Sequence, residues 1–99
     1  MLVIPLQAVP AQTINTTLAQ QSVTITMRQI AAGMLVDLVS NGTPIITGKL
    51  ALDRVRLVRR PYRGFVGDLA VIDTQGTSTP DYSGLGDRWQ LVYLEESDL

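Results

Sequence analysis

The residues whose types could support chemistry gather between positions 73 and 87. The tetrapeptide Asp73-Thr74-Gln75-Gly76 follows Val71 and Ile72, and Asp-Thr-Gly after two apolar residues is typical of dimeric aspartic proteases, whose two carboxylates share one proton. Here Gln75 stands before the glycine, and too little chain follows to build the rest of such a subunit. The pattern instead predicts that Asp73 ends a strand and accepts hydrogen bonds from its own loop in an Asx turn.

The same stretch matches neither a metal loop nor a phosphate loop. Asp73, Asp81 and Asp87 lie eight and six positions apart, whereas a calcium loop supplies oxygens at alternate positions. Its glycines lack the lysine and the strand-to-helix setting of a phosphate-binding loop. The chain has no histidine or cysteine, which removes the commonest general base and every thiolate ligand. We therefore expect a protein that is not an enzyme and has no catalytic, cofactor or metal site.

Composition is typical of one small globular domain spanning residues 1–99. Hydrophobic residues make up 45% of the 99 positions and charged residues 17%, with a net charge of -1. This balance supports a modest core and does not favour specific nucleic-acid binding. The apolar start at 1–6 lacks the basic flank of a signal peptide. No apolar run approaches the roughly 20 residues of a membrane span, so we expect no membrane anchoring.

In the segments expected to position these residues, apolar side chains recur at every second position. Residues 22–30 alternate, with Val23, Ile25 and Met27 on one face, and residues 12–18 alternate more loosely. Asn41-Gly42 separates strand-like runs at 34–40 and 43–47, which predicts a hairpin because both residues accept positive φ. Pro44 has no N–H, so its strand should lie at a sheet edge or begin with an unpaired position.

The second half of the chain continues the strand pattern around a long polar loop. Residues 49–58 favour a further strand, 60–64 a turn, and the apolar runs 65–73 and 88–94 two more strands. Trp89, Leu91 and Tyr93 should share the core face of the last run. The sequence therefore predicts an all-β, small antiparallel sandwich or barrel of about 6–8 short strands. Loops as long as the one at 74–87 are usually functional or disordered.

Several segments resemble the baseplate plug family of contractile-tailed bacteriophages, of the myophage and cyanophage type. They are residues 64–76 (GFVGDLAVIDTQG), 80–89 (PDYSGLGDRW), Ile4-Pro5-Leu6 with Val9-Pro10 and Gln12-Thr13, and 35–38 with Asn41-Gly42. The resemblance covers nearly the whole chain. It implies a structural β-protein of the virion tail baseplate, assembled in the host bacterial cytoplasm. The implied partners are hub, tube and neighbouring baseplate subunits, or copies of itself in a ring, and no catalytic residue is carried over.

Candidate contact residues lie in an arginine-rich segment and in the long loop. They are Arg54, Arg56, Arg59, Arg60, Tyr62 and Arg63, with Asp81, Tyr82 and Leu85. Arginine forks pair with carboxylates and are enriched at protein interfaces, and a tyrosine ring buries area while its hydroxyl finds a partner. The arginines also fit a solvated strand edge that discourages edge-to-edge pairing, or a surface in contact with nucleic acid.

An alternative function from another class is an autonomous β-barrel that binds an oligosaccharide or oligonucleotide. Such a module needs a concave face with exposed aromatic side chains among polar or basic groups. The chain has five aromatic residues, and only Tyr62 and Tyr82 lie outside the predicted strands and their immediate ends. That scarcity favours an assembly protein.

Overall fold

Seven strands and one short 3-10 turn form the part of the chain that the computed structural model describes, residues 2–58 and 67–95. The strands are β1 (Leu2–Ile4), β2 (Ala11–Leu18), β3 (Gln21–Ile30), β4 (Gly33–Ser40), β5 (Thr43–Ala51), β6 (Asp68–Asp73) and β7 (Trp89–Leu94), and the turn is η2 (Tyr82–Gly84). No helix within these two ranges is long and apolar enough to cross a membrane.

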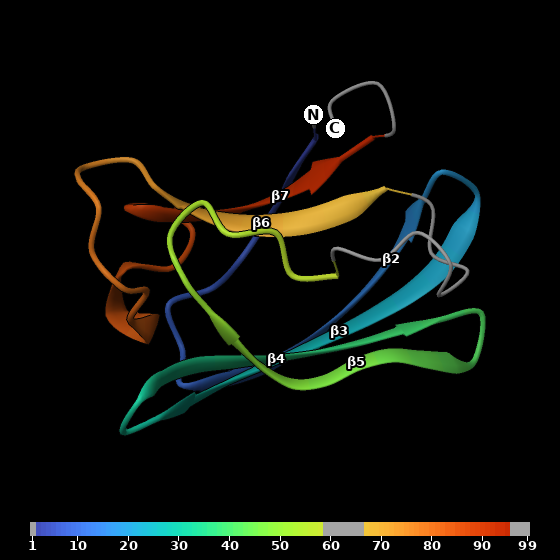
Figure 1. Ribbon diagram of the computed structural model, residues 1–99, viewed down its shortest axis with the longest axis horizontal. Coiled ribbons are helices and arrows are strands. Elements are labelled where there is room, and N and C mark those ends of the chain that lie inside the picture. Colours follow the sequence, from blue (N-terminus) through green and yellow to red (C-terminus); the bar gives the residue numbers. More distant parts are fainter. Residues whose placement is uncertain (1, 59–66, 96–99) are drawn as a thin grey trace.

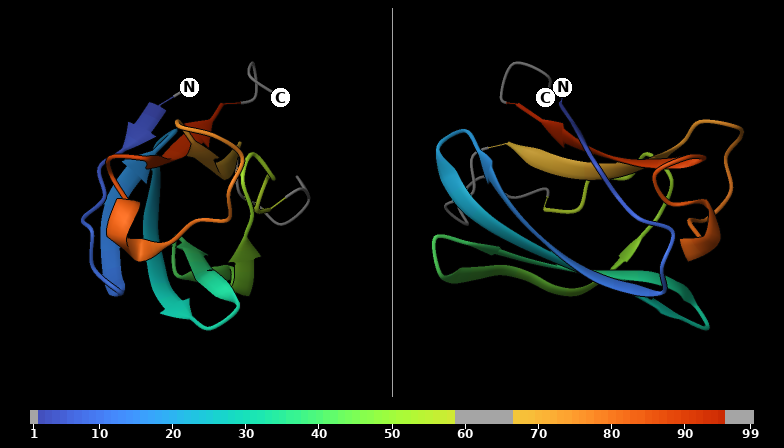
Figure 2. Two further views of the ribbon diagram at one scale, coloured as in Figure 1. Left: turned by 90° about the vertical axis from the view of Figure 1, so that its left-hand side faces the viewer. Right: turned by 180° about the vertical axis from the view of Figure 1, so that it is seen from behind.

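The strands form two antiparallel sheets that face each other (Figures 1 and 2). One sheet has the order β1-β7-β6 and the other the order β2-β3-β4-β5. Within residues 2–58 and 67–95 the sheets do not join into a closed barrel. The all-β antiparallel prediction is therefore confirmed, and of its two alternatives the structure has the sandwich.

The core lies between the sheets because the alternating residues send their apolar side chains inward. Val23, Ile25 and Met27 of β3 are at most 1% exposed, as predicted. Further fully or nearly buried side chains from the neighbouring strand and the opposite sheet include Met34, Val36, Leu38, Leu69, Val71, Leu91 and Tyr93. Trp89 is buried with them, so the predicted core face of β7 is confirmed.

The turn between β4 and β5 has the predicted geometry. Asn41 and Gly42 have φ of 51° and 80°, and they join the paired residues Ser40 and Thr43. β5 is an edge strand of the four-stranded sheet, which confirms the interpretation of Pro44. Two register shifts interrupt the β4–β5 ladder.

The predicted strand at 49–58 is wrong beyond Ala51, where β5 ends. Arg54 has φ of 59°, which breaks the extended backbone. The segment instead runs along the edge of β6: Asp53 forms an isolated bridge with Val71, and the Leu57 N–H donates to the Leu69 carbonyl at 2.8 Å. The turn expected at 60–64 lies outside the described residues, and the strand expected from residue 65 is described from Asp68.

Candidate functional site

The 74–87 loop is fixed at its start by a buried carboxylate. Asp73 is fully buried at the end of β6. Its Oδ1 accepts hydrogen bonds from the Gln75 N–H at 2.9 Å and Arg88 Nε at 2.8 Å. Its Oδ2 accepts from the Ser78 N–H at 2.8 Å and Arg88 Nη2 at 2.9 Å. The predicted Asx turn is confirmed, and the bidentate pair with Arg88 closes the loop across its base.

These contacts keep Asp73 ionised. Hydrogen bonding by the Arg88 guanidinium holds the pKa of the Asp73 carboxyl far below its ordinary value, and the backbone N–H groups of Gln75 and Ser78 lower it further, against the opposing effect of burial. The same pair raises the pKa of Arg88. A carboxylate with four donors and so low a pKa is a poor general base at neutral pH, so Asp73 organises the loop.

A second ion pair holds the loop from the β5–β6 connection. The Asp53 Oδ1 accepts from the backbone N–H of Asp73 at 2.7 Å, and its Oδ2 pairs with Arg54 Nη1 at 2.6 Å. Arg54 also donates to the Gly76 carbonyl from Nη1 and to the Asp73 carbonyl from Nη2, each at 3.1 Å. Within the described ranges no three acidic side chains form a group that could hold a metal ion. Arg54 therefore shapes the loop from its half-exposed position.

Trp89 supports the middle of the loop. Its Nε1 donates to the Ser78 carbonyl at 3.2 Å, and the Arg88 guanidinium lies over its ring, 4.6 Å from the centroid. The backbone of η2 approaches the same ring, because a Cβ built on Gly84 would lie 2.3 Å from Trp89 Cζ3. Only glycine permits this approach, so the indole serves as the platform on which the turn is placed.

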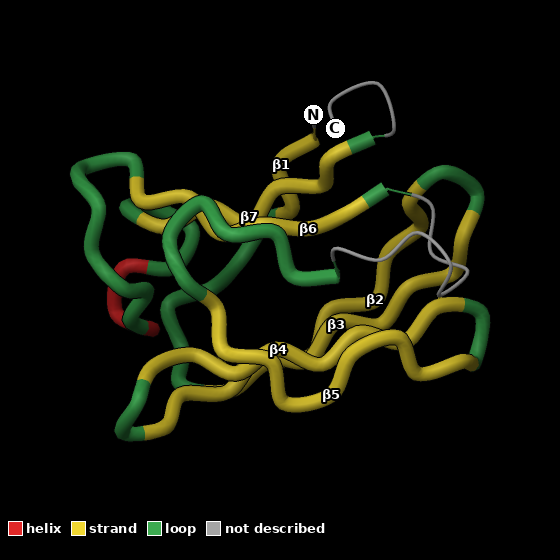
Figure 3. Tube along the Cα trace, in the orientation of Figure 1, coloured by secondary structure: helices red, strands yellow, loops and turns green. Residues whose placement is uncertain are grey.

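Asp81 and Tyr82 form the turn itself, shown as the helical segment in Figure 3. Asp81 caps η2: its Oδ2 accepts from the Ser83 hydroxyl at 2.6 Å and the Ser83 N–H at 3.2 Å. The hydroxyl, followed by the N–H, lowers the pKa of Asp81. The Tyr82 N–H donates to Gln29 Oε1 of β3 at 3.1 Å. The turn is thus attached to the four-stranded sheet as well as to Trp89.

Three large apolar side chains are exposed at the end of the sandwich that carries this loop. Ile30 at the end of β3 is 40% exposed, Leu52 just after β5 is 41% exposed, and Tyr82 is 37% exposed. Ile30 and Leu52 lie at the same end of the four-stranded sheet, at the ends of the two strands that flank β4, since Gly33 of β4 pairs with Ile30 and Met34 of β4 pairs with Ala51. We call these three residues the apolar end patch; their elements meet on the left of Figure 1.

The predicted contact residues that the structure describes are not all on one surface. Arg54 contacts the 74–87 loop, but the segment then leads away, because the Val58 N–H donates to Asp68 Oδ1 at the opposite end of β6. Leu85 is 3% exposed and belongs to the core, so its assignment to a contact surface is wrong. The glycines and polar residues around Leu85 favour an exposed position, but the Leu85 side chain packs into the core. Arg59, Arg60, Tyr62 and Arg63 lie outside the described residues.

Sequence reasoning missed the partners that fix the loop. Arg88 pairs with Asp73 across 15 positions, and Gln29 contacts Tyr82 across 53. The one available signal was local, since Asp73 and Arg88 flank the two apolar runs that become β6 and β7. Antiparallel pairing of those runs brings their adjoining ends together: Asp73 pairs with Trp89.

The described residues form a small antiparallel β-sandwich with a loop held by ion pairs and an exposed apolar end. Residues 1–96 match the family described as cyanophage baseplate Pam3 plug gp18, so the chain belongs to that family, and the predicted resemblance is confirmed. Membership implies a structural component of the phage tail baseplate, located in the virion. None of the curated proteins matches this chain.

Proposed function

We propose that the chain is a non-catalytic plug subunit that packs through the apolar end patch and the 74–87 loop against hub, tube or neighbouring baseplate proteins. It is assembled in the host bacterial cytoplasm and carried in the virion tail. The observation that supports this most directly is the coincidence of three exposed large apolar side chains with a loop held by two ion pairs.

The patch has the chemistry of an interface centre. Aromatic and large aliphatic side chains are enriched where partners exclude water. Because each of these side chains is already more than half buried, covering it contributes a fraction of the roughly 1.5–3 kcal/mol gained by burying a fully exposed one. Tyr82 adds a hydroxyl that can bond to the partner at the edge of the contact.

The hydrogen bonds around Asp73 and Trp89 give the loop one shape before it meets a partner. Ordering a flexible loop during association would reduce the net binding free energy. A loop held by Arg88, Arg54 and Gln29 avoids most of that cost. A docking role would account for the many polar contacts that hold this loop.

The test is Leu52→Asp, with Thr47→Asp on the exposed part of β5 as the matched control. Tagged variants are co-expressed with hub, tube and baseplate proteins, and the bound proteins are measured after purification. We expect Leu52→Asp to lose its partners, because a charge in a desolvated contact costs several kcal/mol, whereas Thr47→Asp retains them. Melting temperature and Trp89 fluorescence report folding. A folded Leu52→Asp variant with normal binding would contradict the proposal.

No described feature favours the ligand-binding barrel. Within the described residues the two sheets do not close into the barrel that this alternative assumes. Among the described aromatic residues Trp89 and Tyr93 are buried in the core, which leaves Tyr82 as the exposed ring.

A further inference from the structure

The outer edge of β2 differs from the other sheet edges of the described structure. β2 is the first strand of the four-stranded sheet and pairs with β3 over all eight of its residues without a register shift. It contains no charged residue and no proline. Its outward side chains Thr13, Asn15 and Thr17 are exposed. A long, regular and uncharged edge is a template for pairing with another strand.

The other edges carry features that prevent such pairing. On β5, Pro44, Lys49 and two register shifts interrupt the edge. On β6, the segment after β5 supplies the Arg54 and Leu57 N–H groups to strand carbonyls. β1 has only three residues. Proteins protect free edges with these same devices, and their absence from β2 indicates that this edge is covered in the assembled state.

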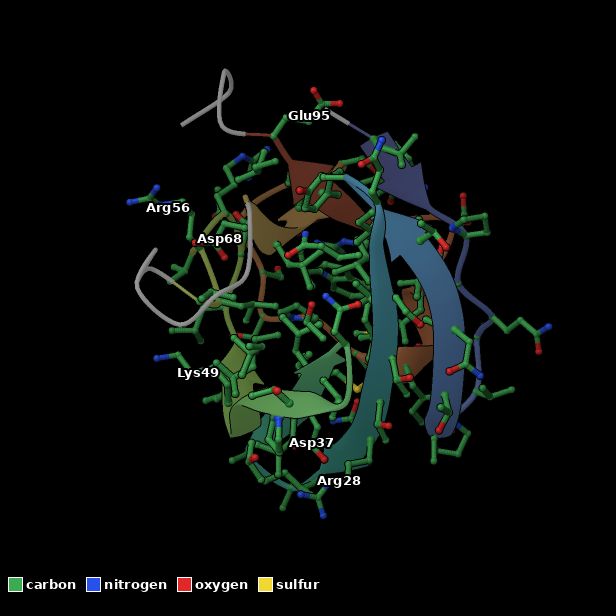
Figure 4. All side chains as sticks on the ribbon, turned by 90° about the vertical axis from the view of Figure 1, so that its right-hand side faces the viewer. Arg28, Asp37, Lys49, Arg56, Asp68 and Glu95 are labelled. Carbon is green, nitrogen blue, oxygen red and sulfur yellow. The ribbon has the colours of Figure 1, made fainter. Side chains whose placement is uncertain are left out.

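The surroundings of β2 are suited to a partner strand. In Figure 2, β1 and β2 lie on the same side of the sandwich, and Leu2 and Val3 of β1 are about half exposed there. Of the charged side chains labelled in Figure 4, Arg28 lies on β3 opposite Ala11 at the start of β2, and the others lie outside β2 and β3; β2 itself has no charged residue. No like charges would therefore oppose a second β2 placed alongside the first.

We propose that two copies of the chain pair antiparallel through β2, with Asn15 opposite Asn15. The four-stranded sheets of the two copies then continue into each other. A head-to-tail ring would need a second regular edge, which the described strands lack, whereas a two-fold axis lets the same edge serve both copies. This inference goes beyond the proposed docking of the loop end and involves a different surface.

The register of the proposed β2–β2 pair follows from which side of the sheet each residue faces and from which part of β2 already has contacts. Opposed residues must point to the same side of the sheet, which allows only pairings that keep the alternation of β2. Gln12 is tied to the preceding chain, since its side-chain amide exchanges hydrogen bonds of 3.1 and 2.8 Å with the backbone of Gln7. Centring the pair on Asn15 leaves Ala11 outside the pairing and sets Gln12 opposite Leu18 at its end. It then opposes Thr13 to Thr17 on the outer face and Ile14 to Thr16 on the inner face.

Cysteine cross-linking tests this register, because the chain has no cysteine of its own. In the full chain, Asn15→Cys should give a disulfide-linked dimer on mild oxidation. Thr13→Cys alone should not, because its counterpart lies four residues along the strand, about 13 Å away, beyond the roughly 7 Å between Cα atoms that a disulfide spans. The double variant Thr13→Cys with Thr17→Cys should cross-link again. Thr47→Cys on β5 gives the background rate.

Sedimentation equilibrium provides the second measurement. The unmodified chain should show a concentration-dependent dimer, and Asn15→Lys should raise its dissociation constant several-fold because two like charges then face each other. Trp89 fluorescence checks that every variant is folded. A strictly monomeric chain whose Asn15→Cys variant cross-links no faster than Thr47→Cys would overturn the proposal, and would leave a strand of another protein as the partner. Efficient cross-linking by Thr13→Cys alone would also overturn it.

Discussion

At the scale of single residues, the ion pair of Asp73 and Arg88 determines the shape of the loop. Asp73→Asn keeps the shape of the side chain but places an NH2 group against N–H donors, so at least one of its hydrogen bonds becomes repulsive. We expect a lower melting temperature and faster amide exchange at Gln75 and Ser78. Asp87→Asn, an exposed position in the same loop, is the control. Equal exchange rates in the two variants would show that the pair is dispensable.

The low pKa of Asp73 also predicts how stability depends on pH. A carboxyl whose folded-state pKa is depressed contributes stability above its unfolded pKa, about 3.9, and loses it as pH falls towards the folded value. The pKa of Asp81 is lowered in the same direction. The melting temperature should therefore hold steady down to about pH 5 and fall below that. Asp73→Asn should flatten the decline, and an unchanged slope would count against this origin.

Gly84 and Gly76 form a matched pair of glycines within the loop. A Cβ on Gly84 would lie 2.3 Å from the Trp89 ring, whereas one on Gly76 would lie 3.5 Å from its nearest neighbours. Gly84→Ala should therefore destabilise the protein by about 1–3 kcal/mol through overpacking, and Gly76→Ala should have little effect. Chemical denaturation followed by Trp89 fluorescence measures both. Similar losses in the two variants would mean that the indole can move aside.

At the scale of elements, the hairpin turn isolates the effect of backbone conformation. Gly42 has φ of 80° and no atom within 4 Å of a Cβ built there, so any loss on substitution comes from the dihedral angle alone. Gly42→Val should destabilise the protein by about 1–3 kcal/mol. Thr43→Val, one residue further on in β5, is the control because threonine and valine are both β-branched. Equal free energies of unfolding for the two variants would contradict this assignment.

The sequence predicted those elements whose conformation depends on neighbouring residues along the chain. The alternation of Val23, Ile25 and Met27 and the Asn41-Gly42 turn both express short-range geometry, so both could be read from the sequence. The segment after Ala51 could not. Its apolar residues include Leu57, whose side chain is buried and whose backbone N–H bonds to the edge of β6 without forming a regular ladder. Whether a chain runs beside a strand or within a sheet depends on the opposite sheet, which the sequence pattern does not contain.

At the scale of the whole molecule, closeness in sequence was a poor guide to the site. The sequence pattern predicts one cluster of arginines, but Arg54 contacts the 74–87 loop while Val58 lies at the far end of β6. Ile30, Leu52 and Tyr82 come from separate parts of the chain and share one end of the sandwich, as the strand pairing and the Tyr82–Gln29 hydrogen bond show. Their grouping depends on how the two sheets close the fold, so composition and periodicity could not supply it.

This separation predicts two different outcomes for arginine variants. Arg54→Glu should weaken the 74–87 loop, because it removes the bonds to Gly76 and Asp73 and faces Asp53 with a like charge. Its loss of stability should accompany any loss of binding to baseplate proteins. For Arg59→Glu with Arg60→Glu, the sequence predicts lost binding with little change in stability, since surface substitutions usually change it by about 0.5 kcal/mol or less.

Comparison of melting temperature with co-purification of hub, tube and baseplate proteins separates the two effects. Arg54→Lys provides the control for charge, because it keeps the cation but cannot reproduce the fork that reaches two carbonyls and Asp53. A stable Arg54→Glu variant would show that the loop does not need this residue. A stable double variant that still binds its partners would remove Arg59 and Arg60 from the docking surface and leave the apolar end patch as the contact to test.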